Sequence, residues 1–362
     1  MDLSAINPIL LIAAMIAAST PILLAAIGEL VVERAGVLNL GVEGMMITGA
    51  VCGFIIAVNT GSPLVGFIAA ALGGALLSFL FAFLTQVTLA NQVASGLALT
   101  LFGLGLSALM GQSYVGIKPP QMVDTQMGFL SDIPIFGPII FGHNIIIYLG
   151  LLIVAGTWAT LKFTRAGLVL RAVGENHDAA HALGYKVKRI RTLAILFGGA
   201  CAGLGGAYIS LIRVPQWTEG MTAGVGWIAL ALVVFASWKP WRVLLGAYLF
   251  GGITQVQLNL QAAGVVFPVS RIGITIVIIC VIIASWNLIF AKKKSRQYYF
   301  WLLFLSIAGV FFTIFFQGAT VPFKVEYLAM SPYLMTIIVL VILSADKSRA
   351  PGSLGRAFHA SQ

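Results

Sequence analysis

The chain has 362 residues, of which 60% are hydrophobic and only 9% are charged, and its mean hydropathy is +1.02. Soluble domains carry about 25% charged residues, so this composition excludes a water-soluble globular protein and a disordered chain. The net charge of +10 would suggest nucleic acid in a soluble protein, but in so apolar a chain it indicates Lys and Arg kept in cytoplasmic loops, and we expect no nucleic-acid partner.

Long apolar runs predict membrane-spanning helices, because roughly 20 apolar residues in a helix cross the hydrocarbon core. We expect an all-α fold, a polytopic transmembrane bundle of about 10–11 spans in a lipid bilayer. Two of the runs are short, and each is tilted, re-entrant or extended by its neighbours. The candidates are Ile9–Ile27, Met45–Val58 (short), Leu64–Leu89, Val93–Met110, Asn144–Leu161, Leu193–Ile212, Gly224–Ser237 (short), Val243–Leu260, Ile272–Phe290, Tyr298–Phe316 and Tyr327–Leu343.

The segment Gly28–Gly44, between the first two runs, carries charges in an apolar setting. Charges near apolar surface must be paired or reach water. One interpretation is an interfacial loop held by a salt bridge from Arg34 to a neighbouring Glu, and the other is a hinge or gate beside a transport path. The candidate gate residues are Glu29, Glu33, Arg34, Asn39 and Glu43.

The polar residues inside the predicted spans are amides and hydroxyls, and the central parts of the spans hold no Asp, Glu, Lys or Arg. Ion-coupled transporters usually keep ionisable groups at membrane depth, so this pattern favours an uncharged, hydrogen-bonding solute. The alternative is that the amides only join helices. The candidate path residues are Asn91, Gln92, Ser95, Thr100, Gln255 and Asn259.

The loop from about Lys162 to Arg191 contains a predicted short helix. Asn176 is a candidate N-cap, Asp178 falls in the first turn, and Gly184 is a candidate C-terminal stop. A helix of two turns is stable only when it is docked, so this helix is a candidate for docking in a groove on a partner protein. His177 and His181 have the spacing of a metal pair, but no third ligand is evident beyond Glu175 and Asp178, and we expect no metal.

The charge distribution predicts the orientation. If all eleven runs cross the membrane, 17 of the 21 basic residues lie on one side, together with the C-terminus. By the positive-inside rule that side is the cytoplasm. The N-terminus is then external by parity, or internal if an early short run is re-entrant.

Four stretches resemble the permease subunits of ABC importers for branched-chain amino acids, sugars and nucleosides, nucleoside-type permeases most closely. They are Gly28–Gly44 with "ERAGVLNLGVEGMM", Asn91–Gly111, Gly167–Gly184 with "GLVLRAVGENHDAAHALG", and "SPYLMTIIVLVILS" with "APGSLG" near the end. The resemblance implies that a helix of the type E-A-A-x-x-x-G docks on the ATPase. On that match the coupling residues here are Glu175, Asn176, Asp178, Ala179, Ala180 and Gly184.

The resemblance also implies a non-enzymatic subunit without cofactors, because ATP and Mg²⁺ bind to a partner. The implied partners are an ATP-binding subunit with two fused cassettes, a second, related permease that forms a heterodimer with this chain, and an extracytoplasmic binding lipoprotein. We expect a permease domain at 1–345 in the bacterial inner membrane, with the coupling loop at 162–192, an extra helical pair at 266–325 relative to the family, and a cytoplasmic tail at 346–362. The sequence itself has no phosphate-binding P-loop, because no Gly-Lys pair occurs in it.

The expected function is therefore ATP-driven import of a small polar solute, with a nucleoside favoured and a sugar, riboflavin or a branched-chain amino acid as alternatives. A stand-alone secondary transporter or channel is a candidate from another class, which the lack of charge within the spans disfavours. A membrane enzyme is a third, but only the residues around His177 would supply its reactive groups.

Overall fold

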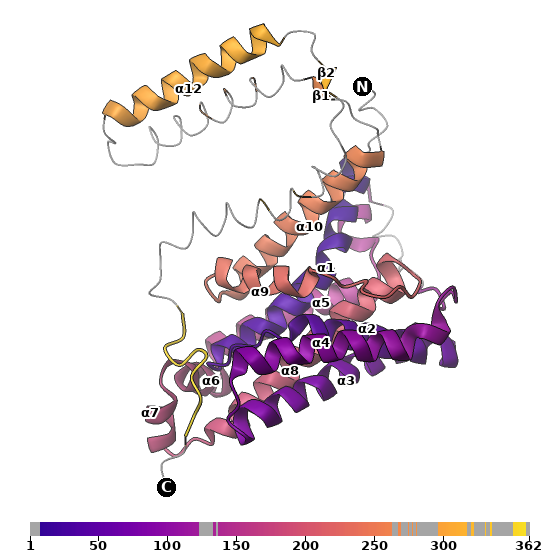
Figure 1. Cartoon of the computed structure of the whole chain (residues 1–362), viewed down its shortest axis with the longest axis vertical. Coiled ribbons are helices and arrows are strands. Elements are labelled where there is room, and N and C mark those ends of the chain that lie inside the picture. The colour runs from indigo at the N-terminus through magenta and orange to yellow at the C-terminus, as the bar shows by residue number, and fades with distance from the viewer. Residues whose placement is uncertain are drawn as a thin grey trace. The chain divides into compact units, whose positions relative to one another are not determined.

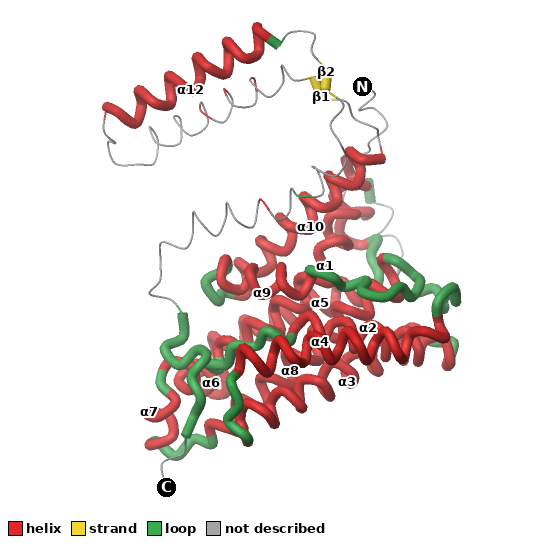
Figure 2. The backbone as a smooth tube through the Cα atoms, viewed as in Figure 1, coloured by secondary structure: helices red, strands yellow, loops and turns green. Residues whose placement is uncertain are grey.

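The computed structural model describes residues 8–122, 133–134, 137–262, 267–268, 274, 277, 280, 296–316, 320–321, 330, 334 and 350–359. Residues 2–256 and 331–362 belong to one compact unit, and residues 257–330 belong to a second. Helices dominate both units (Figure 2). The all-α bundle predicted from the sequence is confirmed.

The first unit contains the principal helices of the chain. Six helical segments of the described residues are long and apolar enough to cross a membrane, while two short helices, α6 and α7, follow α5, and a third, α9, precedes α10. The helices are α1 (Pro8–Arg34), α2 (Val42–Thr60), α3 (Pro63–Ala82), α4 (Gln92–Gly111), α5 (Ile145–Phe163), α6 (Arg165–Glu175), α7 (His177–Ala182), α8 (Val187–Tyr208), α9 (Val225–Phe235) and α10 (Pro240–Ala262, which continues into the second unit), with π-helical turns at Phe83–Val87, Gly137–Phe141 and Ile209–Arg213 and a 3₁₀ turn at Gln112–Tyr114.

The second unit holds α12 (Arg296–Phe315) and two strands of two residues each. Strand β1 (Phe267–Pro268) pairs antiparallel with β2 (Thr320–Val321). Most of the expected span Ile272–Phe290 and of the expected span Tyr327–Leu343 lies outside the described residues, so only the α12 part of the proposed extra pair is seen.

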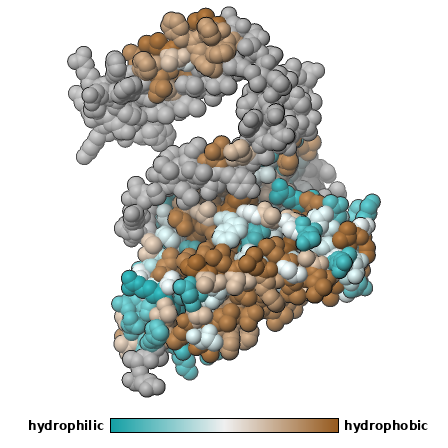
Figure 3. All heavy atoms as spheres, viewed as in Figure 1, coloured by the Kyte–Doolittle hydropathy of each residue, from teal (hydrophilic) through white to brown (hydrophobic). Residues whose placement is uncertain are grey.

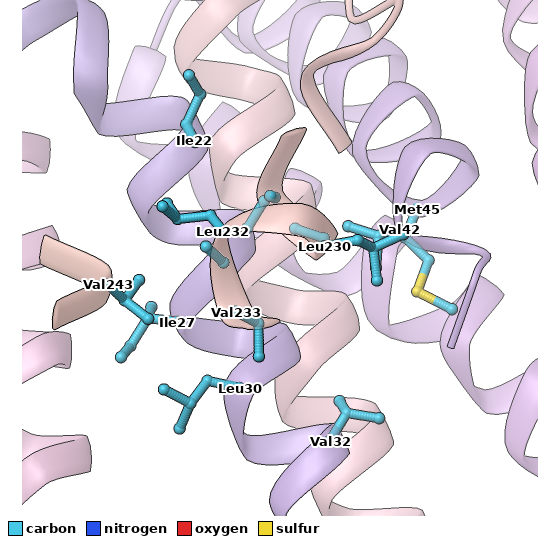
Figure 4. Packing of buried hydrophobic residues seen from close by; sticks show 14 of the residues in the cluster. Ile22, Ile27, Leu30, Val32, Val42, Met45, Leu230, Leu232, Val233 and Val243 are labelled. Carbon is cyan, nitrogen blue, oxygen red and sulfur yellow. The ribbon is translucent and has the colours of Figure 1, made fainter. Parts of the chain in front are cut away.

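Helix α8 packs against α1, α2 and α3 over much of its length. Glycines allow this close approach: a Cβ at Gly206 would meet the backbone of Met46 in α2, and a Cβ at Gly203 would meet the backbone of Ala70 in α3. Small residues let helices approach closely in lipid. A second part of the core joins α1, α2, α9 and α10, where Ile27, Val42 and Val233 belong to one buried cluster (Figure 4).

The bundle of the first unit has two ends. One end, called here the α7 end, carries α6, α7 and residues 350–358, which lie together (Figure 1). The other, called the far end, carries the hydrogen bond between Asn59 and Tyr114 and the contact of Trp217 with Phe54. Figure 3 shows apolar residues along the side of the bundle and hydrophilic residues at its ends, as expected for a bundle that crosses a bilayer.

Candidate functional site

The linker between α1 and α2, residues 35–41, runs along the first half of α4. The N–H of Leu38 donates to Oε1 of Gln92 at 2.8 Å, and the hydroxyl of Thr100 donates to the carbonyl of Leu40 at 3.1 Å. Gln92 and Thr100 are separated by about 12 Å of helix. Helix α2 therefore begins about halfway along α4, and the linker enters the bundle as non-helical chain.

The predicted path residues of α4 all lie on this half of the helix. Asn91 is the N-cap of α4 and accepts from the N–H of Ala94 at 3.0 Å, and Ser95 is buried. In the structure Asn91 thus holds the start of the helix, whereas Gln92 and Thr100 hold the linker. None of these four residues lines the cavity described below.

A second non-helical segment, residues 214–224, returns from the far end into the bundle. Val115 forms a β-bridge with Trp217 at the far end. A few residues later, Thr222 Oγ1 donates to Glu43 at 2.7 Å and the N–H of Gly226 donates to the same carboxylate at 2.8 Å. The Glu43 carboxylate, at the start of α2, therefore caps the N-terminus of α9, where the helix dipole favours negative charge.

Helix α9 covers only part of the membrane thickness. Its 11 residues rise about 16 Å, roughly half of a hydrocarbon core of about 30 Å. The short runs around Met45 and Gly224 thus differ: α2 is extended by its neighbours to 19 residues, whereas α9 is a half-length helix preceded by a re-entrant segment. Discontinuous helices whose ends meet inside the bundle are a feature of transporter sites.

The last turn of α1 holds the other end of α9. Arg34 donates from Nε and Nη2 to the carbonyl of Trp238 at 3.2 and 3.0 Å, and Nε1 of Trp238 donates to Glu33 at 2.5 Å. Trp238 and its neighbour Ser237 have positive φ angles of 53° and 49°, which are uncommon for residues other than glycine. The predicted salt bridge from Arg34 to a neighbouring Glu is wrong, because the guanidinium binds a carbonyl instead.

The interpretation of Gly28–Gly44 as an interfacial loop is also wrong. Gly28–Arg34 is the end of α1, and α2 begins at Val42, so only residues 35–41 are non-helical. Glu29 and Asn39 are buried, and Asn39 Nδ2 donates to Glu29 Oε2 at 3.1 Å. The five predicted gate residues therefore lie in three hydrogen-bonded groups around the linker and α9: Glu29 with Asn39, Glu33 and Arg34 with Trp238, and Glu43 with Thr222 and Gly226. Whether these groups act as a gate stays a prediction.

The predicted short helix is present as α7. The Asn176 side chain accepts from the N–H of Ala179 at 2.9 Å, and Gly184 has a φ of +87° just beyond the helix. Asp178 and Ala179 are exposed, whereas Ala180 is buried against Phe358 and Val187. Ala180 therefore faces the protein and not the solvent.

Glu175 lies at the end of α6, and the structure brings it to the segment 350–358. Its side chain accepts from the N–H of Gly352 at 3.4 Å, and its carbonyl accepts from the hydroxyl of Ser353 at 3.4 Å. The sequence did not predict this contact, because 177 residues separate the two partners.

Arg191 is a functional candidate that sequence reasoning missed, and His177, which the sequence suggested only as a metal ligand or an enzyme's reactive group, is its partner. Nδ1 of His177 lies 3.2 Å from Nη2 of Arg191, and Nε2 lies 3.5 Å from the Asp178 carboxylate. Burial lowers the pKa of His177, and the positive charge of Arg191 lowers it further. The ring is therefore neutral, and Nδ1 accepts the hydrogen bond. Arg191 is fully buried, which nothing in its basic sequence neighbourhood indicated.

A cavity of about 380 Å³, lined by apolar residues and a few polar ones, lies at the far end, between α1, α5, α8 and α10. Asn144 Nδ2 donates to the hydroxyl of Tyr208 at 3.4 Å in its wall. Of the predicted path residues, only Gln255 lines this cavity, and Asn259 follows one turn later on α10. Its remaining polar lining, missed by sequence reasoning, is His143, Asn144, Tyr208 and Arg213.

Metal-binding geometry is not found in the part of the chain that the structure describes, where no three His, Cys, Asp or Glu side chains gather. His177 faces Arg191, and His181 packs against the ring of Phe358 at 5.1 Å between centroids. Both histidine rings therefore pack against Phe358, and His177 also binds Arg191.

The fold and the site are those of a multi-pass membrane protein of the transporter class. The chain has several apolar spans, a half-length helix that meets a buried carboxylate, and a capped helix at one end. A family model described as branched-chain amino acid transport system / permease component matches residues 11–283. The chain belongs to this family. It is thus a permease component, a membrane subunit of an ABC transport system that works with an ATPase and a substrate-binding protein and is not itself catalytic.

Named relatives agree with this assignment. The chain is 44% identical to a putative glucose ABC transporter permease of Haloferax volcanii, over 70% of this chain and 78% of the relative. It is 32% identical to a nucleoside ABC transporter permease of Lactococcus lactis (68% and 81%) and 32% identical to a guanosine ABC transporter permease of Bacillus subtilis (75% and 87%). No solved structure shows significant similarity to it.

Proposed function

We propose that this chain is the pore-forming subunit of an ABC importer and that α7, with Gly184, contacts the ATP-hydrolysing partner. The observation that carries the proposal is the tip of α7. There Leu183 is 77% exposed, next to a capped helix and outside the membrane spans. Tyr185, two residues further on, is 41% exposed, and together the two side chains leave an apolar tip available to a protein partner. ATP and Mg²⁺ then bind to that partner, and the permease needs no cofactor.

The α7 end faces the cytoplasm in this proposal. It carries most of the basic residues of the first unit, as the positive-inside rule requires: Arg34, Lys162, Arg165, Arg171, Lys186, Lys188, Arg189, Arg191, Lys239, Arg242 and Arg356. The C-terminus is then cytoplasmic, the membrane is the inner (cytoplasmic) membrane, and the far end meets a binding lipoprotein. A second, related permease completes the pore, and the ATPase carries two fused cassettes.

The linker 35–41 and the N-terminus of α9 form the moving element of the pore in this proposal. Both are non-helical at their entry into the bundle. Two hydrogen bonds to Glu43 hold the start of α9, and the hydrogen bonds of Leu38 with Gln92 and of Leu40 with Thr100 hold the linker on α4. Such contacts can exchange without unpacking the glycine-rich interface of α8. The solute enters from the far end, where the cavity around Asn144 and Tyr208 has the volume of a small-molecule site.

The proposed solute is a nucleoside. Asn144, Tyr208 and Gln255 give the cavity wall amide and hydroxyl groups that suit a ligand with several hydrogen-bonding groups, beside the positive charge of Arg213. Two relatives are named for nucleoside or guanosine transport. Glucose is the second candidate, favoured by the 44% identity to a permease named for glucose. A nucleoside and a hexose share this hydrogen-bonding character.

Uptake into proteoliposomes tests the function. The permease is reconstituted with its ATPase, second permease and binding lipoprotein, and labelled guanosine or uridine is offered with and without a tenfold excess of glucose. We expect ATP-dependent uptake of the nucleoside that glucose does not displace. Displacement by glucose would assign a sugar instead, and uptake driven by an ion gradient without ATP would identify a secondary transporter.

A single substitution tests the α7 contact. Leu183→Asp places a charge on the exposed tip, and we expect at least a tenfold loss of ATPase that copurifies with the permease. Val115→Asp is the matched control, because Val115 is also exposed, at 65%, but lies at the far end. Equal loss in both variants, or none in Leu183→Asp, would contradict the proposed contact.

A further inference from the structure

Arg191 joins three separate segments of the chain from a fully buried position at the start of α8. Its Nε donates to the carbonyl of Ala35 at 3.1 Å, in the α1–α2 linker. Its Nη1 donates to the carbonyl of Arg356 at 3.0 Å, in the segment 350–358. Its Nη2 donates to Nδ1 of His177 at 3.2 Å, in α7. One guanidinium therefore contacts the linker, the C-terminal segment and the helix proposed to meet the ATPase.

The segment 350–358 fills the space between α7 and the linker. On the α7 side, the N–H of Ser353 donates to the carbonyl of Gly174 at 2.8 Å, and its hydroxyl accepts from the N–H of His177 at 3.1 Å. Phe358 packs on the His177 ring at 5.4 Å between centroids. Figure 1 shows this segment in yellow beside α6 and α7.

On the linker side, Gln92 completes the connection. Its Nε2 donates to the carbonyl of Arg356 at 3.4 Å, while its Oε1 accepts from the N–H of Leu38 at 2.8 Å. The C-terminal segment thus reaches the linker twice, once through Arg191 and once through Gln92. Gln92, one of the predicted path residues, thus bridges two chain segments.

The chemistry of Arg191 makes these contacts rigid. Burying a guanidinium is costly unless its donors are satisfied, and its partners here are two carbonyls and a neutral imidazole. The donors point in fixed directions in one plane, and charged donors make strong hydrogen bonds. If α7 moves, the linker must therefore follow it, or these hydrogen bonds must break.

We propose that Arg191 and the segment 350–358 form a joint that transmits movement of α7 to the linker 35–41, and through it to Glu43 and the start of α9. Arg191 is a positioning residue of transport in this assignment, since it acts through α7 and the linker and does not meet the solute. The C-terminal segment belongs to the same joint. The inference rests on the proposed function, because it assumes that a partner moves α7.

The principal test compares Arg191→Gln, Arg191→Lys and Arg189→Gln in the reconstituted complex. The readout is solute imported per ATP hydrolysed, which a merely structural defect would not change once assembly is matched. We expect at least a tenfold fall for Arg191→Gln and a smaller fall for Arg191→Lys, because an ammonium cannot bridge three acceptors in one plane. Arg189, on the same helix but exposed, is the control and should behave as wild type.

Phe358→Ala tests the joint without altering Arg191. We expect the same fall in solute imported per ATP as for Arg191→Gln. The double variant Arg191→Gln with Phe358→Ala should show no further fall, because both substitutions disrupt the same joint. Additive losses would overturn the proposal, as would normal coupling in either single variant. If Arg191→Gln fails to assemble, Arg191→Lys and Phe358→Ala decide the question.

Amide hydrogen exchange separates this inference from the proposed function. In the purified permease, Arg191→Gln should speed exchange in residues 35–38 and 350–358 but not around Asn59 and Tyr114 at the far end. Unchanged exchange in the linker would overturn the joint. Absence of ATP-dependent uptake by the wild-type complex would overturn the proposed function, and the exchange measurement would still test the joint.

Discussion

Buried charged side chains in the described residues bind neutral partners from distant parts of the sequence. Glu33 accepts from Trp238 and Glu43 from Thr222, across 205 and 179 residues, and Arg191 donates to two carbonyls and an imidazole. Sequence reasoning paired Arg34 with an adjacent Glu because only neighbours are visible in a sequence. The charged residues could be recognised as unusual, but their partners could not be predicted.

His177 gives the joint a dependence on pH. Burial and the charge of Arg191 lower its pKa, and Asp178, Arg356 and His359 also face it. As the pH falls, His177 is therefore protonated in the unfolded chain before it is protonated in the folded one. The stability that the neutral ring contributes is complete above about pH 6.5, the pKa of histidine in an unfolded chain. It is lost as the pH falls through the lower pKa of the folded state. The control is His177→Asn, whose amide oxygen keeps an acceptor near the Nδ1 position without titrating. When the pH is lowered from about 7.5 to about 5.5, we expect the melting temperature to fall further in the wild type than in this variant. The same slope in both proteins would show that His177 does not titrate in this range.

At the scale of elements, local signals in the sequence predicted helices well. The cap at Asn176 and the stop at Gly184 define α7, and the long apolar run from Asn144 matches α5 closely. The sequence did not predict the continuation of α1 to Arg34, nor the hydrogen bonds that hold the non-helical segment 214–224 inside the bundle. The helix end and the segment both depend on hydrogen bonds between α1, α2 and α9, which stabilise polar chain inside the bundle only after the bundle has formed.

The packing of α8 on α2 predicts a large effect of one methyl group. In Gly206→Ala the new Cβ would meet the backbone of Met46, and overpacking of this kind costs about 1–3 kcal/mol. Gly105→Ala is the control, because a Cβ there meets nothing within 4 Å and alanine favours a helix by about 1 kcal/mol. Thermal unfolding in detergent should show a lower melting temperature for Gly206→Ala and an equal or higher one for Gly105→Ala. Equal behaviour would mean that α8 and α2 are not in such close contact.

At the scale of the molecule, the connections fix which helix ends share a side. Arg191 at the start of α8 contacts Ala35 just after α1, and Gln92 at the start of α4 contacts both the linker and the C-terminal segment. The end of α1 and the starts of α4 and α8 therefore lie at the α7 end, and the start of α1 lies toward the far end. Parity arguments from the sequence reached the same arrangement, although they could not establish which of the short runs cross.

This arrangement predicts which side of the membrane each end meets. With the α7 end in the cytoplasm, a cysteine at Leu183 is protected from a membrane-impermeant maleimide in intact spheroplasts, and a cysteine at Thr60, the last residue of α2, is labelled. Inverted vesicles should give the reverse. Both positions are exposed, and the native Cys52, Cys201 and Cys280 are first replaced by alanine. The expected orientation follows from the basic residues of the α7 end, because the positive-inside rule keeps loops rich in Lys and Arg on the cytoplasmic side of the bilayer. Labelling of Leu183→Cys from outside would place α7 and the C-terminal segment on the external face, where no ATP-hydrolysing partner could reach them.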